Sequence, residues 1–482
     1  MSLTSALNAA ISGLNANSRA VSVVSSNLAN ALTQGYAPRS LALEADGAGP
    51  GVRPAGVVRN VDTQLVQERR LATSALGQAE TGAAFLSRIE GLIGTPDQAG
   101  SLSARLTAFE SDLVSAANRP EAGQSLQAAV NSAKALTGEF VAISSGLQAM
   151  RSEAESAISR AVGTINSTLS EIETLNAGIA SARAQGRETA GLEDTRQKAI
   201  DRMAEFLPLR QAPRDNGMVA LFTKGGATLV DGPAAQLEFT PANVIAPHMT
   251  AENGLLNGLT INGVPVPVSA DDGPVGGGRL ATLFTIRDET AVNAQADLDA
   301  LARNLVERFQ QAGLDPSRGV GAPGLFTDSG SVFDPADETG LSGRLALNTA
   351  VDPASGGAPW RLRDGLGATA PGAAGDGSLL RQLSDVLVAE DTLASGALGA
   401  AARSASGHVA GFVSQVSQAR VAQDQSVSFA ASRHSELAAQ EARGGVDSDL
   451  ELQRLLSIEQ AYSANARMIE TVDEMMQTLL RV

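Results

Sequence analysis

Apolar residues recur every seven positions in two segments, one near each end of the chain. The N-terminal row consists of Leu7, Leu14, Val21 and Leu28, and the C-terminal row consists of Leu455, Tyr462, Ile469 and Met476. Each row has a companion row three residues further on, with a single asparagine in it, Asn17 or Asn465. Heptad spacing turns one stripe of a helix toward a partner helix. The pattern therefore predicts paired N- and C-terminal coiled-coil helices, and the eight row residues form the predicted assembly seam.

The chain between these ends begins with a break and then becomes helical. Gly and Pro are frequent in residues 33–59, which favours a linker or an extended segment over a helix. Apolar residues at three- and four-residue spacing predict helices over 61–93, 102–117, a long stretch after Pro120 that ends near Ala184, and 192–206. Because roughly 60 helical residues span on the order of 90 Å, this part is expected to be elongated.

The apolar period changes to two between residues 207 and 285, which indicates strands. Candidate strands flank Lys224-Gly225-Gly226 and also Asn262-Gly263, a dipeptide typical of tight hairpins. Helical periodicity returns at 288–312 and again at 379–441, with a Gly- and Pro-rich stretch and a strand candidate at 344–347 between them. Gly444-Gly445 separates the last of these helices from the C-terminal heptads.

This order of elements predicts a mainly α protein with a β insert, elongated and multi-domain. We expect a terminal coiled-coil assembly domain (1–50 with 440–482), a helical-bundle core (51–206 with 285–325 and 378–439) and a β-rich outer domain (207–284 with 326–377). Because the chain runs out and returns, both termini should lie together at one end, with a distal β domain at the other.

Composition excludes several classes of protein. With 36 basic and 52 acidic residues the net charge is −16, which argues against a nucleic-acid partner. The absence of cysteine excludes a disulfide scaffold and a thiolate metal site. No stretch approaches the ~20 apolar residues of a membrane helix, so no membrane partner is expected. Residues 1–7 lack the basic and apolar regions of a cleavable signal peptide.

Candidate chemistry is sparse, and we expect no catalytic, cofactor-binding or metal-ligating residue. His248, His408 and His434 show no metal-ligand spacing. The acidic run 447–451 lacks the glycine and glutamate positions of a calcium loop. Acidic residues also favour a helix N-terminus, so we expect Asp447 or Ser448 to cap the C-terminal helix.

The two ends carry more than heptads. The runs Ile11-Ser12-Gly13-Leu14-Asn15-Ala16, Ser26-Asn27-Leu28-Ala29-Asn30 and Thr33-Gln34-Gly35-Tyr36, together with residues 459–469, resemble the terminal signatures of the bacterial flagellar axial proteins, which form the rod, hook and hook-associated family. From these runs we define the axial motif as Ser12, Gly13, Asn27, Asn30, Gly35, Tyr36 and Asn465. Residues 191–197 and 225–232 are similar to central segments of the hook-associated members.

The resemblance implies a structural protein of the bacterial flagellum that joins hook to filament. It further implies a homo-oligomer in a tubular lattice, with the hook protein and a second hook-associated junction protein as neighbours and an export chaperone on the C-terminal helix. Its location would be extracellular, after export without a cleaved signal peptide. The alternatives are another axial component such as the hook protein, a coiled-coil signalling module, or a secreted enzyme domain on a flagellar scaffold.

Two interpretations of the terminal rows stay open at this point. In the first, the two rows pack on each other as one intramolecular helical hairpin. In the second, both rows are surfaces that become buried between neighbouring copies of the chain.

Overall fold

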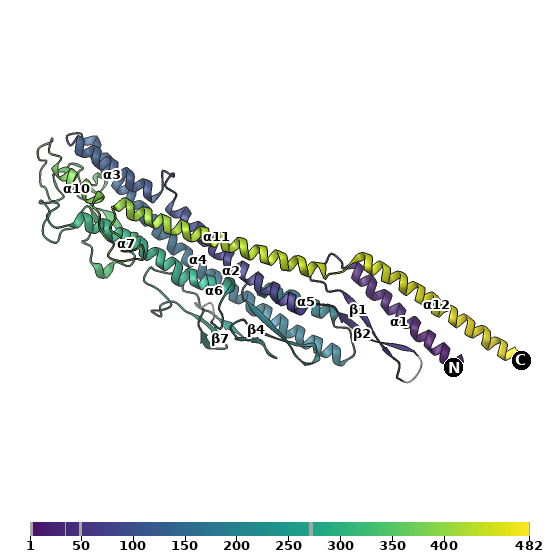
Figure 1. Ribbon diagram of the computed structural model, residues 1–482. Helices are drawn as coiled ribbons and strands as arrows, with labels where there is room; N and C mark the ends of the chain where they lie inside the picture. Colours follow the sequence, from purple (N-terminus) through teal and green to yellow (C-terminus); the bar gives the residue numbers. More distant parts are fainter. Residues whose placement is uncertain (1–2, 34, 48–50, 269–272, 482) are drawn as a thin grey trace.

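The computed structural model describes residues 3–33, 35–47, 51–268 and 273–481, so the first two residues of the N-terminal segment lie outside the described residues. The molecule is a long, mostly helical rod with both termini side by side at one narrow end (Figure 1). The predictions of an elongated, mainly α protein with a β insert and adjacent termini are confirmed.

The longer helices follow the predicted segments closely. They are α1 (Leu3–Ala29), α2 (Thr63–Ile93), α3 (Leu102–Asn118), α4 (Gly123–Ala184), α5 (Ala190–Ala204), α7 (Ala291–Gln310), α10 (Ser378–Val388), α11 (Ala405–Arg443) and α12 (Ser448–Arg481). The short ones are α6 (Gly278–Thr285), α8 (Leu341–Arg344), α9 (Trp360–Asp364), the π turn η2 (Ile286–Thr290) and the 3-10 turns η1 (Asp215–Gly217), η3 (Pro335–Asp337) and η4 (Pro353–Ser355).

Local signals explain where several helices begin and end. Asp62 caps α2 by accepting hydrogen bonds from the N–H groups of Gln64 and Leu65, and the helix ends at Gly94, whose φ of +74° suits glycine. Asp447 caps α12 in the same way, because its carboxylate accepts from the N–H groups of Asp449 and Leu450. The capping prediction for the 447–451 acidic run is thereby confirmed.

The β structure consists of small antiparallel sheets. The strands are β1 (Arg39–Ala45), β2 (Val52–Arg59), β3 (Leu209–Pro213), β4 (Val219–Thr223), β5 (Thr228–Val230), β6 (Leu237–Glu238), β7 (Leu259–Ile261), β8 (Val264–Val266), β9 (Phe326–Asp328) and β10 (Leu345–Leu347). They pair as β1-β2, β3-β4-β5, β6-β7-β8 and β10-β9. Both hairpins predicted from turn dipeptides form, and Asn262 and Gly263 have φ values of 51° and 75° between β7 and β8.

The position of the β segments corrects the prediction of a distal β domain. The sheets from β3 to β8 lie alongside the middle of the rod, whereas α3 and α10 occupy the end farthest from the termini (Figure 1). The side chain of Asn166 on α4 donates to the carbonyl of Leu237, and that of Asn176 donates to the carbonyl of Val219. These strands are therefore fastened along α4, and their buried residues belong to the same apolar cluster as Ile165 and Leu169 of α4.

Three further details differ from the predicted segmentation. Residues 326–377 do not join the sheets of 207–284, because β9 and β10 pair only with each other and Phe326 packs edge-on against Phe109 of α3 and Phe309 of α7. Helix resumes at Gly278 rather than near 288. The predicted 379–441 helix is two helices, and buried Arg308 donates to the carbonyls of Val386, near the end of α10, and of Ala389 and Arg403, in the break between the helices.

Candidate functional site: the terminal helix pair and its anchor

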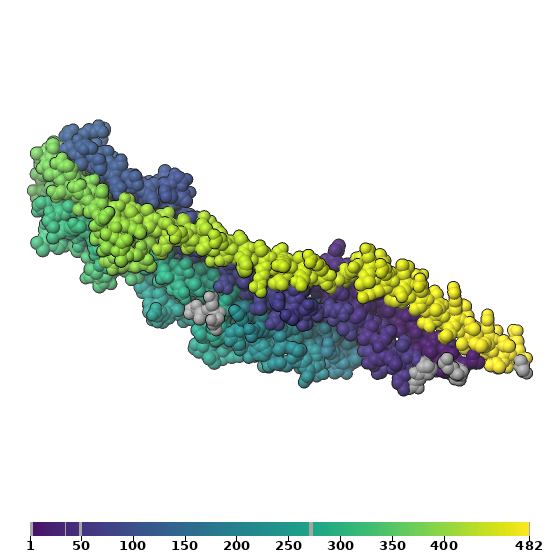
Figure 2. Space-filling view, in the orientation of Figure 1, coloured from purple at the N-terminus to yellow at the C-terminus, as the bar shows by residue number. Residues whose placement is uncertain are grey.

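Helices α1 and α12 pack on each other in opposite directions and form what we call the terminal pair (Figure 1). Figure 2 shows α11 and α12 continuing one another as a ridge along the visible face, with α1 beneath α12. The intramolecular interpretation of the terminal rows is therefore correct for the part of each helix that faces the other.

The predicted seam residues divide into two groups. Leu7, Leu14, Val21, Leu455 and Ile469 are half-buried. By contrast, Leu28, Tyr462 and Met476 are 38%, 47% and 46% exposed. The heptad rows thus lie only partly at the contact between the two helices.

The inner contact of the terminal pair is built from small residues. A Cβ on Gly13 would lie 2.7 Å from Nδ2 of Asn465, so glycine permits the close approach of the two helices at this level. Ala10 and Val24 of α1 and Val472 of α12 are buried. The structure thus brings together two members of the axial motif, Gly13 and Asn465, that are 452 residues apart in the chain (465 − 13 = 452).

α12 carries large apolar side chains that remain exposed in spite of its contact with α1, and they lie on more than one side of the helix. They include Leu452, Leu456, Tyr462, Met468, Met475, Met476, Leu479 and Leu480. Isolated apolar residues are ordinary on a protein surface, whereas so many large ones along a single helix indicate an interaction surface.

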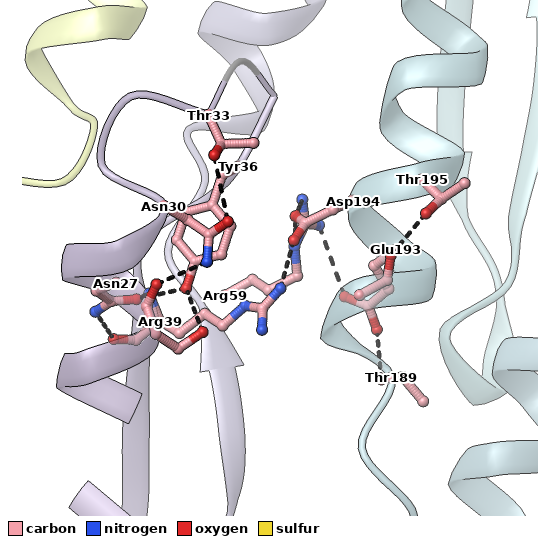
Figure 3. A network of polar contacts seen from close by, with 12 residues as sticks. Asn27, Asn30, Thr33, Tyr36, Arg39, Arg59, Thr189, Glu193, Asp194 and Thr195 are labelled. Carbon is pink, nitrogen blue, oxygen red and sulfur yellow. Dashed lines mark hydrogen bonds and ion pairs between the residues drawn. The ribbon is translucent and has the colours of Figure 1, made fainter. Parts of the chain in front are cut away.

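The other members of the axial motif fasten α1 to the hairpin β1-β2. Asn27 is fully buried, and its side chain donates to the carbonyl of Arg39 (2.8 Å) and accepts from the N–H of Arg39 (3.0 Å) and the hydroxyl of Tyr36 (2.8 Å). The Arg39 guanidinium lies 4.7 Å from the centre of the Tyr36 ring, a cation–π distance. Gly35, at φ +74°, supplies the turn before Tyr36. Figure 3 shows Asn27, Tyr36 and Arg39 in one network of polar contacts.

Ser12 and Asn30 hold neighbouring points of the same structure. The hydroxyl of Ser12 accepts from the N–H of Val52 at 3.2 Å, which ties the middle of α1 to the start of β2. The amide of Asn30 donates to the carbonyl of Ser26, and its oxygen accepts from the Thr33 hydroxyl at the end of α1. All seven axial-motif residues therefore lie at contacts within the terminal pair or at the joint next to it.

The hairpin in turn is bound to α5 by two acidic residues (Figure 3). Arg39 and Arg59 lie opposite each other in the β1-β2 register, and both reach Asp194, at 2.6 and 2.7 Å. Glu193 accepts from Thr189 and Arg183 and lies 3.7 Å from Arg59. Burial alone raises the pKa of Glu193, but these hydrogen bonds and the two arginine charges outweigh it and leave the pKa below its ordinary value.

Sequence reasoning missed the two arginines and their acidic partners as a site. The family-like segment 191–197 and the Gly- and Pro-rich segment 33–59 were each recognised, but nothing in the sequence connected them. Only folding brings the arginines close to these acidic residues, since Arg39 and Asp194 are 155 residues apart in the chain. The only usable signal was that residues 191–197 resemble a family segment without an assigned role.

The part of the chain that the structure describes offers little chemistry of other kinds. Among those residues, no group of three or more His, Asp or Glu is arranged to hold a metal ion. Within the same ranges, none of the helices combines the length and apolarity needed to cross a membrane. His408 is buried, and its Nε2 lies 2.7 Å from the carbonyl of Asp391, which is a structural contact.

Comparison with known families places three segments of the chain among flagellar proteins. The model of the flagellar hook-associated protein FlgK helical domain matches residues 86–323. The flagella basal body rod protein model matches residues 7–36, and that of the flagellar basal body rod FlgEFG protein C-terminal region matches residues 443–482. The two terminal matches coincide with the terminal pair.

Individual relatives are similar over most of the chain. Flagellar hook-associated protein 1 of Bacillus subtilis (strain 168) is 23% identical over 514 residues, which cover 97% of this chain and 96% of that protein. The protein of the same name from Salmonella typhimurium is 25% identical over 72% of this chain, which spans 65% of the relative's length. The solved flagellar hook junction protein FlgK from Burkholderia pseudomallei superposes with a TM-score of 0.45 at 23% identity, over 54% of this chain and 46% of that one.

Proposed function

Because this chain belongs to the family of flagellar hook-associated protein 1, we propose that it is a structural subunit of the bacterial flagellum that joins the hook to the filament. The observation that carries the proposal is the terminal pair. It combines the rod-protein and FlgEFG-type terminal segments with large apolar side chains of α12 that remain exposed.

The mechanism we infer is mechanical. Copies of the chain associate through the outward apolar residues of the terminal pair, including Leu28, Tyr462 and Met476, and form a tubular lattice. Apolar burial between copies supplies the free energy of association, roughly 25 cal/mol per Å² removed from water. The helical rod then extends from this inner layer, and the sheets along α4 add to its flank.

The finer statements about partners follow from this proposal. We place the hook protein on one side of the ring of copies and a second hook-associated junction protein on the other. Before assembly, the exposed apolar side chains of α12 would need to be shielded from water in the cell, and an export chaperone bound to this helix does so. Localisation outside the cell, without a cleaved signal peptide, belongs to the same proposal.

A non-enzymatic role fits the names of the relatives, which are those of structural flagellar proteins. The residues of the terminal pair provide apolar surface and hydrogen bonds that fix orientation. The chain divides into a terminal assembly part, a helical core and β segments. The terminal part makes the lattice contact, and the core and the β segments form the outer body.

Electron microscopy of flagella from cells that lack this protein tests the proposal. Cells with hooks but without attached filaments support a junction protein. Loss of the hook itself would instead support the alternative of another axial component, such as the hook protein. Restoration of filaments by the full chain, but not by a chain that lacks residues 448–481, would connect the function to α12.

A further inference from the structure

We propose that Asp194 is a positioning residue that fixes the direction in which the terminal pair leaves the helical core. It acts through the hairpin β1-β2, which carries α1 on its other side. The inference rests on the proposed function, because a fixed direction matters to a chain that must fit a lattice. The unassigned family-like segment at 191–197 acquires a role in this way.

Few other contacts fix the angle between the helical core and the part of the chain that contains the terminal pair. We call α1, β1, β2 and α12 the terminal module. Its α12 is separated from α11 by a short non-helical segment that includes Gly444 and Gly445. A groove of about 1570 Å³ runs beside the joint, lined by Leu32, Lys198 and Glu441 among others, so the module is not enclosed by the core on that side.

Asp194 holds both strands of the hairpin at once. Because Arg39 and Arg59 are register partners at the base of the hairpin, their guanidinium groups reach the same carboxylate from neighbouring strands. Arg39 donates to Oδ2, and Arg59 donates to Oδ1 through Nε (2.9 Å) and its terminal nitrogen (2.7 Å). The three side chains are 10–16% exposed, so these charge-assisted bonds are only weakly screened by salt.

The clamp is continuous with rigid structure on both sides. On the module side, the backbone of Arg39 is held at its N–H and its carbonyl by the buried Asn27 of α1. On the core side, Arg196 donates to Asn176 of α4 and to the carbonyl of Gly217, both at 2.8 Å, which fixes the start of α5. Polar contacts therefore connect α4 to α5 through Arg196. They continue from α5 to α1 through Asp194, Arg39 and Asn27.

The chain itself offers a matched control. Asp201 also lies on α5 and likewise forms ion pairs with two arginines, Arg69 at 2.9 Å and Arg70 at 2.7 Å. Both of these arginines belong to α2, which is part of the core. Removing the charge of Asp201 therefore breaks a double arginine contact of the same kind without touching the terminal module.

The test measures the angle of the joint in the purified full chain. Because the protein has no cysteine, spin labels can be placed on introduced cysteines at Ser432 of α11 and Ser463 of α12, both exposed. Pulsed electron paramagnetic resonance then gives the distribution of distances across the joint. We expect one narrow distribution for the parent chain and for Asp201→Asn, and a distribution at least about twice as wide for Asp194→Asn.

The conservative variant completes the design. Asp194→Glu keeps the charge and should restore a distribution narrower than that of Asp194→Asn, with the helical core melting at the same temperature by circular dichroism. A parent chain that is already broad, an Asp194→Asn chain as narrow as the parent, or equal broadening in Asp201→Asn would each overturn the proposal. None of these outcomes depends on whether cells without the protein lose their filaments, so the two proposals fail independently.

Discussion

At the scale of single residues, the joint depends on buried polar side chains that bond to one another and to the backbone. Asn27 satisfies both backbone groups of Arg39 as well as the Tyr36 hydroxyl. A buried amide of this kind contributes little net free energy of folding while it is paired, but removing it leaves its buried partners without a hydrogen bond. The axial motif is therefore explained by hydrogen bonds within the chain as well as by contacts between copies.

We predict that Asn27→Ala detaches α1 from the hairpin locally. The N–H and the carbonyl of Arg39 lose their partner, which should destabilise the module by about 1–3 kcal/mol. Hydrogen exchange at the Arg39 amide measures this directly, because that N–H donates to Asn27. Asn30→Ala is the control, since Asn30 bonds only near its own helix end, and it should cost about 0.5 kcal/mol or less.

We also predict that the acidic anchor weakens at low pH. Since the pKa of Glu193 is lowered in the fold, its stabilising contribution is complete above the ordinary value of 4.5 and is lost as the pH falls through the lower folded value. Thermal melting of Glu193→Gln should therefore lie below that of the parent at pH 7 and approach it near pH 3. Glu188→Gln, at an exposed position, should follow the parent throughout; a constant gap between Glu193→Gln and the parent would contradict the prediction.

At the scale of elements, the terminal pair combines an internal contact with exposed apolar surface. Gly13 and Asn465 mark a level at which α1 and α12 approach closely. Tyr462 and Met476 of α12 nevertheless remain 47% and 46% exposed. One helix pair can therefore be both an intramolecular hairpin and a lattice surface, and the two interpretations of the heptads are complementary.

We predict that Gly13→Val separates the terminal pair more than its helix propensity accounts for. The new side chain would collide with Asn465, whereas a Cβ added to Gly163, in the interior of α4, would have no atom within 4 Å. Gly163→Val therefore carries the propensity effect alone and serves as the control. Proximity labelling between cysteines introduced on α1 and α12 should fall for Gly13→Val and stay unchanged for Gly163→Val.

A second element-scale prediction separates the internal contact of the terminal pair from its exposed apolar surface. Met476→Asp places a charge on the exposed face, so the purified chain should melt as the parent does while incorporation into flagella is lost, because burying an unpaired carboxylate costs several kcal/mol. Leu14→Asp should weaken the terminal pair itself, since Leu14 is half-buried within the chain. Ser22→Asp, exposed on α1, is the mild control in both assays. Normal assembly of Met476→Asp would show that this face is not a lattice surface.

At the scale of the whole molecule, one core runs along α4 and includes the β segments. Buried residues of β4, β5, β6 and β7 belong to the same apolar cluster as those of α2, α3 and α7. The 62 residues of α4 act as a spine that α2, α3, α5 and α7 contact, together with β5, β6 and β10. The β segments are therefore part of the helical body rather than an appendage to it.

We predict that removing residues 209–276 destabilises the remaining helices. The cut can be closed, because the N–H of Leu280 lies 3.2 Å from the carbonyl of Phe206. Exposing buried residues of α4 such as Ile165 and Leu169 should cost about 1.5–3 kcal/mol each. Helical circular dichroism should then melt at much lower temperature, whereas deletion of exposed residues 369–371 should change it little. A shortened chain as stable as the parent would show that the β segments fold separately.

The sequence alone determined the features that depend on neighbouring residues. Apolar spacing located α2, α3, α4 and both terminal helices, the Asn262-Gly263 pair located a hairpin, and the acidic run located the cap at Asp447. These are short-range signals, because periodicity and turn chemistry act over a few residues. Tertiary structure decided which face of each terminal helix is covered, where the sheets lie along α4, and that Arg39 and Arg59 meet Asp194. Such contacts join residues 43 to 155 or more positions apart, and only packing of the whole chain selects among the many pairings that the same side chains allow.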